Sequence, residues 1–198
     1  MRNKFIVIEG IDGAGTTTQT TLLAQKIFEN IKETQILLTR EPTAGKYGKK
    51  IRQMLKEGKS PKLYGEKFLE LFVRDRIEHL RFFENFNGIV ISDRHKHSTY
   101  CYQQAQGVSL KKIHSLHKNF KAPDVTVLLD IPVKIALARM KYKKNKEMFD
   151  KHRQFLNQVR RNYLNLKNIL DEPIIVINGI GTKMQVLNRI WQKLKIML

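Results

Sequence analysis

The sequence has little cysteine and no long hydrophobic run. Cys101 is the only cysteine, so no disulfide can form within the chain. Isolated cysteines are usual in reducing compartments, which makes the cytoplasm the expected location. The first apolar run, Phe5–Ile8, is too short for a signal peptide or a membrane span. No membrane partner is therefore expected.

Patterns that would indicate a zinc protein or a repeat protein are also absent from the sequence. The six histidines have no cysteine cluster beside them, and no H-E-x-x-H pattern occurs. Internal repeats, low-complexity segments and linkers are missing as well. The 198 residues are therefore expected to form a single domain, 1–198, with a hydrophobic core of its own.

Acidic residues are few. The chain has 37 Lys and Arg against 18 Asp and Glu, which gives a net charge of +19. Such an excess favours an anionic partner, either a nucleic acid or a small phosphate-bearing molecule. The alternative is a lysine-rich solvated surface with no specific role. Because the cations are spread along the chain and no nucleic-acid motif occurs, we expect no nucleic-acid partner.

A glycine-rich turn between an apolar run and an amphipathic stretch is the most informative segment. Gly10 and Gly15 are spaced as in the phosphate-binding pattern G-x-x-x-x-G-K-S/T. Thr17 holds the position of the hydroxyl that binds Mg²⁺, whereas Thr16 replaces the lysine. A helix that begins near Thr16 would direct its free N–H groups at phosphates. The residues expected to bind ATP are Gly10, Ile11, Asp12, Gly13, Ala14, Gly15, Thr16, Thr17 and Thr18.

Apolar runs alternate with helical patterns along the rest of the chain. Such alternation favours an α/β fold with one parallel sheet. The runs expected to form strands are 5–8, 36–38, 89–91, 125–130 and 174–177. Apolar residues recur at helical spacing in the intervening segments, among them 66–86, 98–106 and 109–120, while 57–61 is expected to be a loop. Catalytic residues are expected at the carboxyl ends of the strands.

Polar residues follow the buried run 89–91. Asp93 at this place can act near Mg²⁺ or its waters, and the alternative is a helix cap. For Arg94 the alternative is a surface cation, although its position favours a function. Phe72 and Arg76 lie four residues apart and therefore share a helix face. This pair can stack on a base and donate to its edge, but periodicity alone favours a core Phe72 and a solvated Arg76.

A concentrated basic run occupies residues 139–146. It is either a solvated face or a mobile lid that closes cations over a triphosphate.

In their order along the chain, these segments resemble the thymidylate kinase family of P-loop nucleoside-monophosphate kinases. The resemblance covers essentially the whole chain. It rests on the phosphate loop, Arg40–Glu41–Pro42, Phe72 with Arg76, Asp93–Arg94–His95 with Ser98 and Tyr102–Gln103, Pro123–Asp124, and the basic run. It implies a P-loop NTPase fold with a five-stranded parallel sheet, helices on both faces and a lid at about 139–150. It also implies a homodimer that uses ATP and Mg²⁺ to convert dTMP into dTDP for dTTP synthesis.

The resemblance further implies a role for individual residues. Asp12 would lie near the dTMP sugar and phosphate, and Arg40 and Arg94 would hold that phosphate. Phe72 would stack on thymine and Arg76 would donate to its edge, which reverses the interpretation from periodicity. Tyr102 would disfavour a ribose 2′-hydroxyl, and Ser98 and Gln103 complete the substrate set. The expected metal-site residues are Thr17, Glu9 and Asp93. The expected catalytic residues are Asp12, Arg94, Arg139, Lys143 and Lys144.

Two departures from the family pattern leave alternatives open. The segment Asp12–Ala14 lacks an arginine that some members carry there, so the lid is expected to supply that cation. Thr16 lacks the charge of the usual lysine, and losing one such group costs about 10²–10³ in rate elsewhere. One alternative is therefore a catalytically weakened nucleotide-binding protein. The other is a deoxynucleoside kinase, although two cations for an acceptor phosphate argue against it.

Overall fold

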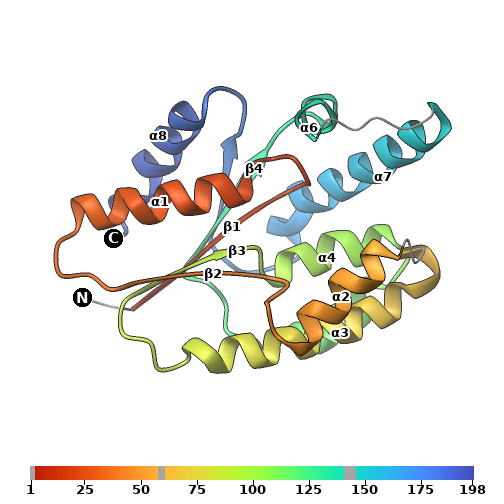
Figure 1. Ribbon diagram of the computed structural model, residues 1–198, viewed down its shortest axis with the longest axis horizontal. Helices are drawn as coiled ribbons and strands as arrows, with labels where there is room; N and C mark the ends of the chain where they lie inside the picture. The colour runs from red at the N-terminus through yellow and green to blue at the C-terminus, as the bar shows by residue number, and fades with distance from the viewer. Residues whose placement is uncertain (1–2, 58–60, 141–145) are drawn as a thin grey trace.

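The computed structural model describes residues 3–57, 61–140 and 146–198. In this part of the chain a five-stranded sheet with the order β2-β3-β1-β4-β5 lies at the centre (Figure 1). The strands are β1 Lys4–Gly10, β2 Ile36–Arg40, β3 Ile89–Asp93, β4 Val125–Asp130 and β5 Ile174–Asn178. All neighbouring strands are parallel, so their carboxyl ends meet at one edge. This confirms the predicted α/β class and the predicted sheet.

Helices cover both faces of the sheet. In Figure 1, α1 and α8 lie together on one side, and α3 and α4 lie on the other. The helices of the described chain are α1 Thr16–Asn30, α2 Lys46–Lys56, α3 Pro61–Phe83, α4 Lys96–Ala105, α5 Leu110–His117, α6 Val133–Arg139, α7 Lys146–Asn165 and α8 Lys183–Leu194, with a 3-10 turn at Leu166–Asn168. None of them is long and apolar enough to cross a membrane.

The central strand β1 shows why its sequence is a continuous apolar run. Ile6 and Ile8 belong to the same hydrophobic cluster as Leu23 of α1. Phe5 and Val7 belong to another cluster, with Phe83 of α3. Because successive side chains of a strand point to opposite faces, a strand covered on both faces needs apolar residues at every position.

The long helix α3 differs from the prediction at both ends. It begins at Pro61, inside the expected loop, and ends at Phe83 rather than at residue 86. Proline is well accommodated in the first turn of a helix, because its missing N–H has no helical partner there. At the other end Phe86 donates its N–H to the Phe83 carbonyl, which closes a turn instead of another helical repeat. The helix α5 is also shorter than predicted and ends at His117.

Candidate active site

The phosphate loop joins β1 to α1, and α1 begins at Thr16 as predicted. Gly13 of the loop has a φ of +83°, and a Cβ atom there would lie 2.6 Å from the Ala136 carbonyl oxygen of α6. Only glycine fits this position without strain. Gly15 is the N-cap of α1, with no side-chain cap hydrogen bond in the described chain. The first N–H groups of α1 are therefore available to an anion.

Thr17 and Asp93 form a pair at the carboxyl end of β3. The Thr17 hydroxyl donates to Asp93 Oδ2 at 2.5 Å, whereas Asp93 Oδ1 is buried and has no partner among the described residues. Both residues line a cleft of 530 Å³. A hydroxyl and a carboxylate fit Mg²⁺, which is usually held by few protein oxygens together with water and phosphate. Within the described chain no cluster of three or more His, Cys, Asp or Glu residues could hold a metal.

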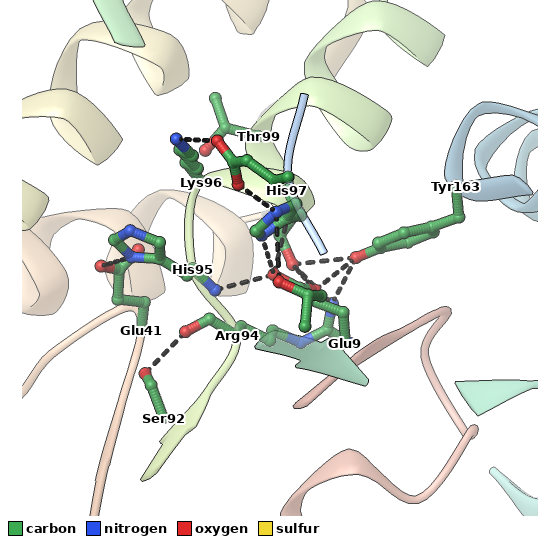
Figure 2. A network of polar contacts seen from close by, with 12 residues as sticks. Glu9, Glu41, Ser92, Arg94, His95, Lys96, His97, Thr99 and Tyr163 are labelled. Carbon is green, nitrogen blue, oxygen red and sulfur yellow. Dashed lines mark hydrogen bonds and ion pairs between the residues drawn. The ribbon is translucent and has the colours of Figure 1, made fainter. Parts of the chain in front are cut away.

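Glu9 has a different environment from the one predicted for a metal-site residue. Its Oε1 accepts the N–H groups of His95 at 2.7 Å and Ser98 at 3.2 Å. Its Oε2 accepts the Ser98 hydroxyl at 2.7 Å and the Tyr163 hydroxyl at 2.8 Å. Figure 2 shows the Tyr163 side chain pointing toward Glu9. These contacts occupy both oxygens of a fully buried carboxylate and hold the start of α4 against β1. They leave Thr17 and Asp93 as the pair that fits a metal.

Arg94 is held rigidly just beyond β3. Its φ of 75° lies in the left-handed region, and its backbone is fixed by bonds to the Ile8 carbonyl and the Ser92 hydroxyl. The guanidinium donates to Asp12 Oδ1 at 2.8 Å and to the Ser98 hydroxyl at 3.0 Å. Burial works to lower the pKa of Arg94, but the surrounding tyrosines and carboxylates raise it well above its usual value. Arg94 is therefore a permanent cation in a fixed place.

A second cavity, of 190 Å³, lies beside Arg94. Asp12 lines it, together with all the predicted substrate residues except Arg40: Phe72, Arg76, Arg94, Ser98, Tyr102 and Gln103. Here the interpretation from periodicity is wrong for Arg76, which is only 1% exposed. The Tyr102 hydroxyl accepts the Asp12 N–H at 3.0 Å, which ties the phosphate loop to the cavity wall.

Arg40 lies in the other cleft. It is exposed at the end of β2, in register with Asp93 on β3, and it lines the 530 Å³ cleft with Thr17 and Asp93. This places Arg40 beside Thr17 and Asp93, and its contact with an acceptor phosphate stays a prediction. Arg52 carried no predicted role, yet its guanidinium donates to the Pro42 and Thr43 carbonyls near the smaller cavity. Helical periodicity gives no signal that distinguishes Arg52 from other exposed cations of α2.

Arg139, the last residue of α6, contacts the backbone of the phosphate loop through its side chain. Its guanidinium donates to the carbonyls of Ala14 at 3.2 Å and Gly179 at 3.0 Å. Lys143 and Lys144, the other predicted lid cations, lie outside the described residues. The predicted lid segment 139–150 includes the end of α6 and the start of α7, since α7 begins at Lys146.

The cavity wall also contains buried residues that carried no predicted role, notably Glu41 and His95. Glu41 accepts from Arg76 and faces His79 and His95. Burial works to raise the pKa of Glu41, but Arg76, His95 and His79 hold it well below its usual range. Burial lowers the pKa of His95 to about 4. At neutral pH the carboxylate is therefore an anion and His95 is neutral. The only sequence signal for Glu41 was its place just beyond a strand end.

Comparison with known proteins gives one family. Residues 8–190 match the family model described as thymidylate kinase. A protein of Methanococcus maripaludis named probable thymidylate kinase is 42% identical over 168 residues, which are 84% of this chain and 78% of the relative. A probable thymidylate kinase of Thermococcus kodakarensis is 40% identical over 182 residues, 87% of this chain and 88% of the relative. Another strain of M. maripaludis has a protein of the same name that is 36% identical over 197 residues, 97% of this chain and 93% of the relative.

Proposed function

Because the chain belongs to the thymidylate kinase family, we propose that it transfers a phosphoryl group from ATP to dTMP and releases ADP and dTDP. The observation that carries this proposal is the 190 Å³ cavity beside the phosphate loop. The cavity is lined by the aromatic ring of Phe72 and the buried Arg76, and also by Tyr102 and Arg94. This set suits a base, a sugar and a phosphate in that order.

The acceptor nucleotide would occupy the smaller cavity. Phe72 would stack on the thymine ring, and Arg76 would donate to the edge of the base. Tyr102, whose ring lies 5.5 Å from the Arg94 Cζ, would pack against the sugar. Arg94 would hold the phosphate, because a guanidinium presents two parallel donors to phosphate oxygens.

The donor phosphates would lie on the phosphate loop at the start of α1. Thr17 and Asp93 would hold Mg²⁺, which supplies charge neutralisation on the phosphate oxygens when it is bound. Thr16 contributes an N–H but no charge, so other cations must stabilise the transferred group. We propose that Arg94 and Arg139 act there together with Lys143 and Lys144 of the lid.

The protein is further proposed to act as a homodimer in the cytoplasm. Large apolar side chains are exposed at several places on the described helices, among them Leu63 and Ile77 of α3 and Leu116 of α5. A dimer would remove this surface from water. The free and buried Cys101 fits a reducing compartment.

A coupled assay of ADP release with dTMP, dUMP and thymidine tests the function. We expect Mg²⁺-dependent turnover with dTMP and none with thymidine. Turnover on thymidine alone would refute the proposal in favour of a deoxynucleoside kinase. Tight dTMP binding without turnover would instead favour a catalytically weakened nucleotide-binding protein. Arg161→Ala removes an exposed arginine of α7 that lines neither cavity. It shows what the loss of one positive charge does when that charge lies outside the site.

A further inference from the structure

The guanidinium of Arg76 is almost fully committed to protein acceptors. Its Nε and Nη2 donate to Glu41 Oε2 at 2.9 Å and 2.5 Å. A second Nη2 hydrogen is directed at the Thr99 hydroxyl at 3.2 Å, and Nη1 lies 2.7 Å from His117 Nε2. An arginine carries five N–H donors in all. One Nη1 hydrogen is therefore left without an acceptor among the described residues, and Arg76 lines the cavity.

His117 is an acceptor in this network. Its Nδ1 lies 2.7 Å from the Ile113 carbonyl oxygen, which can only accept a hydrogen bond. The hydrogen of a neutral ring is therefore on Nδ1, and Nε2 offers its lone pair to Arg76. Burial and the nearby Arg76 cation lower the pKa of His117 to about 3, so the ring remains neutral at physiological pH.

Glu41 is itself held from the opposite side. Its Oε1 lies 3.0 Å from Nδ1 of His79 and 3.0 Å from Nδ1 of His95. Figure 2 shows the Glu41 carboxylate facing the His95 ring. His79 is fixed in turn by Thr39, whose hydroxyl lies 2.7 Å from its Nε2. Because both carboxylate oxygens are engaged, Glu41 cannot rotate without breaking several buried hydrogen bonds.

The cavity therefore presents a defined hydrogen-bonding pattern. Arg76 offers one donor, and Gln103 offers a buried Oε1 that has no partner among the described residues. A donor and an acceptor in one cavity complement a pyrimidine with a carbonyl at position 4 and a hydrogen on N3. Cytosine carries an amino group at position 4 and no N3 hydrogen. Its amino group would face the Arg76 cation, donor against donor, and Gln103 Oε1 would find no hydrogen to accept.

We propose that Glu41 is a positioning residue that sets the base specificity of this cavity, by fixing Arg76 so that a single N–H meets a 4-oxo pyrimidine. This inference rests on the proposed function. Without the carboxylate, Arg76 would be a buried cation with two freed N–H groups. Such a group is costly to bury, so the guanidinium would turn toward other acceptors or water.

The test is Glu41→Gln, which keeps the shape of the side chain and removes its charge. The KM and kcat for dTMP and for dCMP are measured together with direct binding of both nucleotides by calorimetry. We expect the KM for dTMP to rise roughly tenfold to hundredfold, the range for losing a charged hydrogen bond, and the preference for dTMP over dCMP to shrink. The kcat at saturating dTMP should change much less, because Arg76 lies at the base rather than at the phosphate.

Glu172→Gln is the matched control. Glu172 is also a nearly buried, ion-paired carboxylate, 2.5 Å from Lys96 Nζ and 3.1 Å from His97 Nε2, but it lines neither described cavity. Unchanged preference in Glu41→Gln, or an equal change in Glu172→Gln, would overturn the proposal. If Glu41→Gln does not fold, Glu41→Asp must shift the preference in the same direction by a smaller factor, and no shift overturns it.

The calorimetric binding measurements separate this inference from the proposed function. A wild-type protein that binds dTMP more tightly than dCMP without turnover would refute the kinase activity. The effect of Glu41→Gln on the ratio of the two binding constants would still decide the role of Glu41.

Discussion

Replacing Arg94 by alanine and by glycine separates the role of its charge from its role in the fold. Arg94 is the fixed cation between the phosphate loop and the 190 Å³ cavity, and it has a φ of 75°. Both variants remove the guanidinium. Only glycine adopts this left-handed conformation at no cost, whereas other residues lose roughly 1–2 kcal/mol there.

The two variants should therefore be equally inactive but unequally stable. Because each variant loses one preorganised electrostatic group, kcat should fall by a factor of about 10²–10³ in both variants. The ion pair with Asp12, whose side chain is 47% exposed, adds at most about 1 kcal/mol to stability. Relief of strain should make Arg94→Gly more stable than Arg94→Ala by about 1–2 kcal/mol, and each kcal/mol corresponds to roughly 2–4 °C in Tm for a chain of this size.

The assay pairs steady-state ADP release with thermal unfolding of the same preparations, and Arg161→Ala serves as the control. A direct role of the guanidinium in catalysis would be refuted if activity followed Tm across the two variants, since the guanidinium would then act through the fold. Retained kcat in Arg94→Ala would remove Arg94 from the catalytic machinery.

Three further changes have defined outcomes. Thr16→Lys should alter kcat only modestly if other cations neutralise the phosphates as proposed; a rise of several orders of magnitude in the ADP-release assay would mean that nothing compensates. Thr17→Val removes the hydroxyl that donates to Asp93 and should raise the Mg²⁺ concentration needed for half-maximal rate, whereas Thr17→Ser should restore it. Acid should destabilise the fold. Burial lowers the pKa of His95 to about 4 and that of His117 to about 3, from an ordinary value of 6.5. Because the unfolded chain therefore binds more protons, the Tm should fall as the pH drops from about 6.5 toward 4. The lowered pKa of Glu41 acts in the same direction below its ordinary value of 4.5. A Tm that stays constant from pH 7 to 4 would contradict the lowered pKa values of the two histidines.

Local sequence patterns predict the elements well, because periodicity and glycine chemistry are local. The run 125–130 is β4 without adjustment, and α1 begins at Thr16 as the loop pattern required. Long-range partners are a different matter. Arg76 was indistinguishable from a solvated helical arginine, yet its acceptors Glu41 and His117 come from positions 35 and 41 residues away. Helical spacing identifies a face but not what covers that face.

Residues beside strand ends illustrate the same limit. Glu9 and Asp93 are both acids at the carboxyl ends of neighbouring strands, so the sequence predicts one role for both. The structure separates them because α4 begins directly over Glu9 and supplies the His95 and Ser98 N–H groups. Among the described residues the Asp93 carboxylate accepts only the Thr17 hydroxyl and keeps one oxygen without a partner. The direction of the following helix, rather than the residue type, decides which acid remains available to a metal.

The same geometry bears on the charge that Thr16 does not supply. In a usual phosphate loop the cation comes from the first turn of α1 and moves with the loop. Here Arg94 reaches the loop from β3 through Asp12 at 2.8 Å, and Arg139 reaches it from α6 through the Ala14 carbonyl at 3.2 Å. Both cations contact the loop without belonging to it, and each is fixed by contacts with a different element. If Arg94 and Arg139 supply the positive charge at the phosphates, as proposed, that charge depends on the packing of β3 and α6 against the loop. Substitutions that weaken the packing of α6 should then lower kcat even where they leave the Tm unchanged.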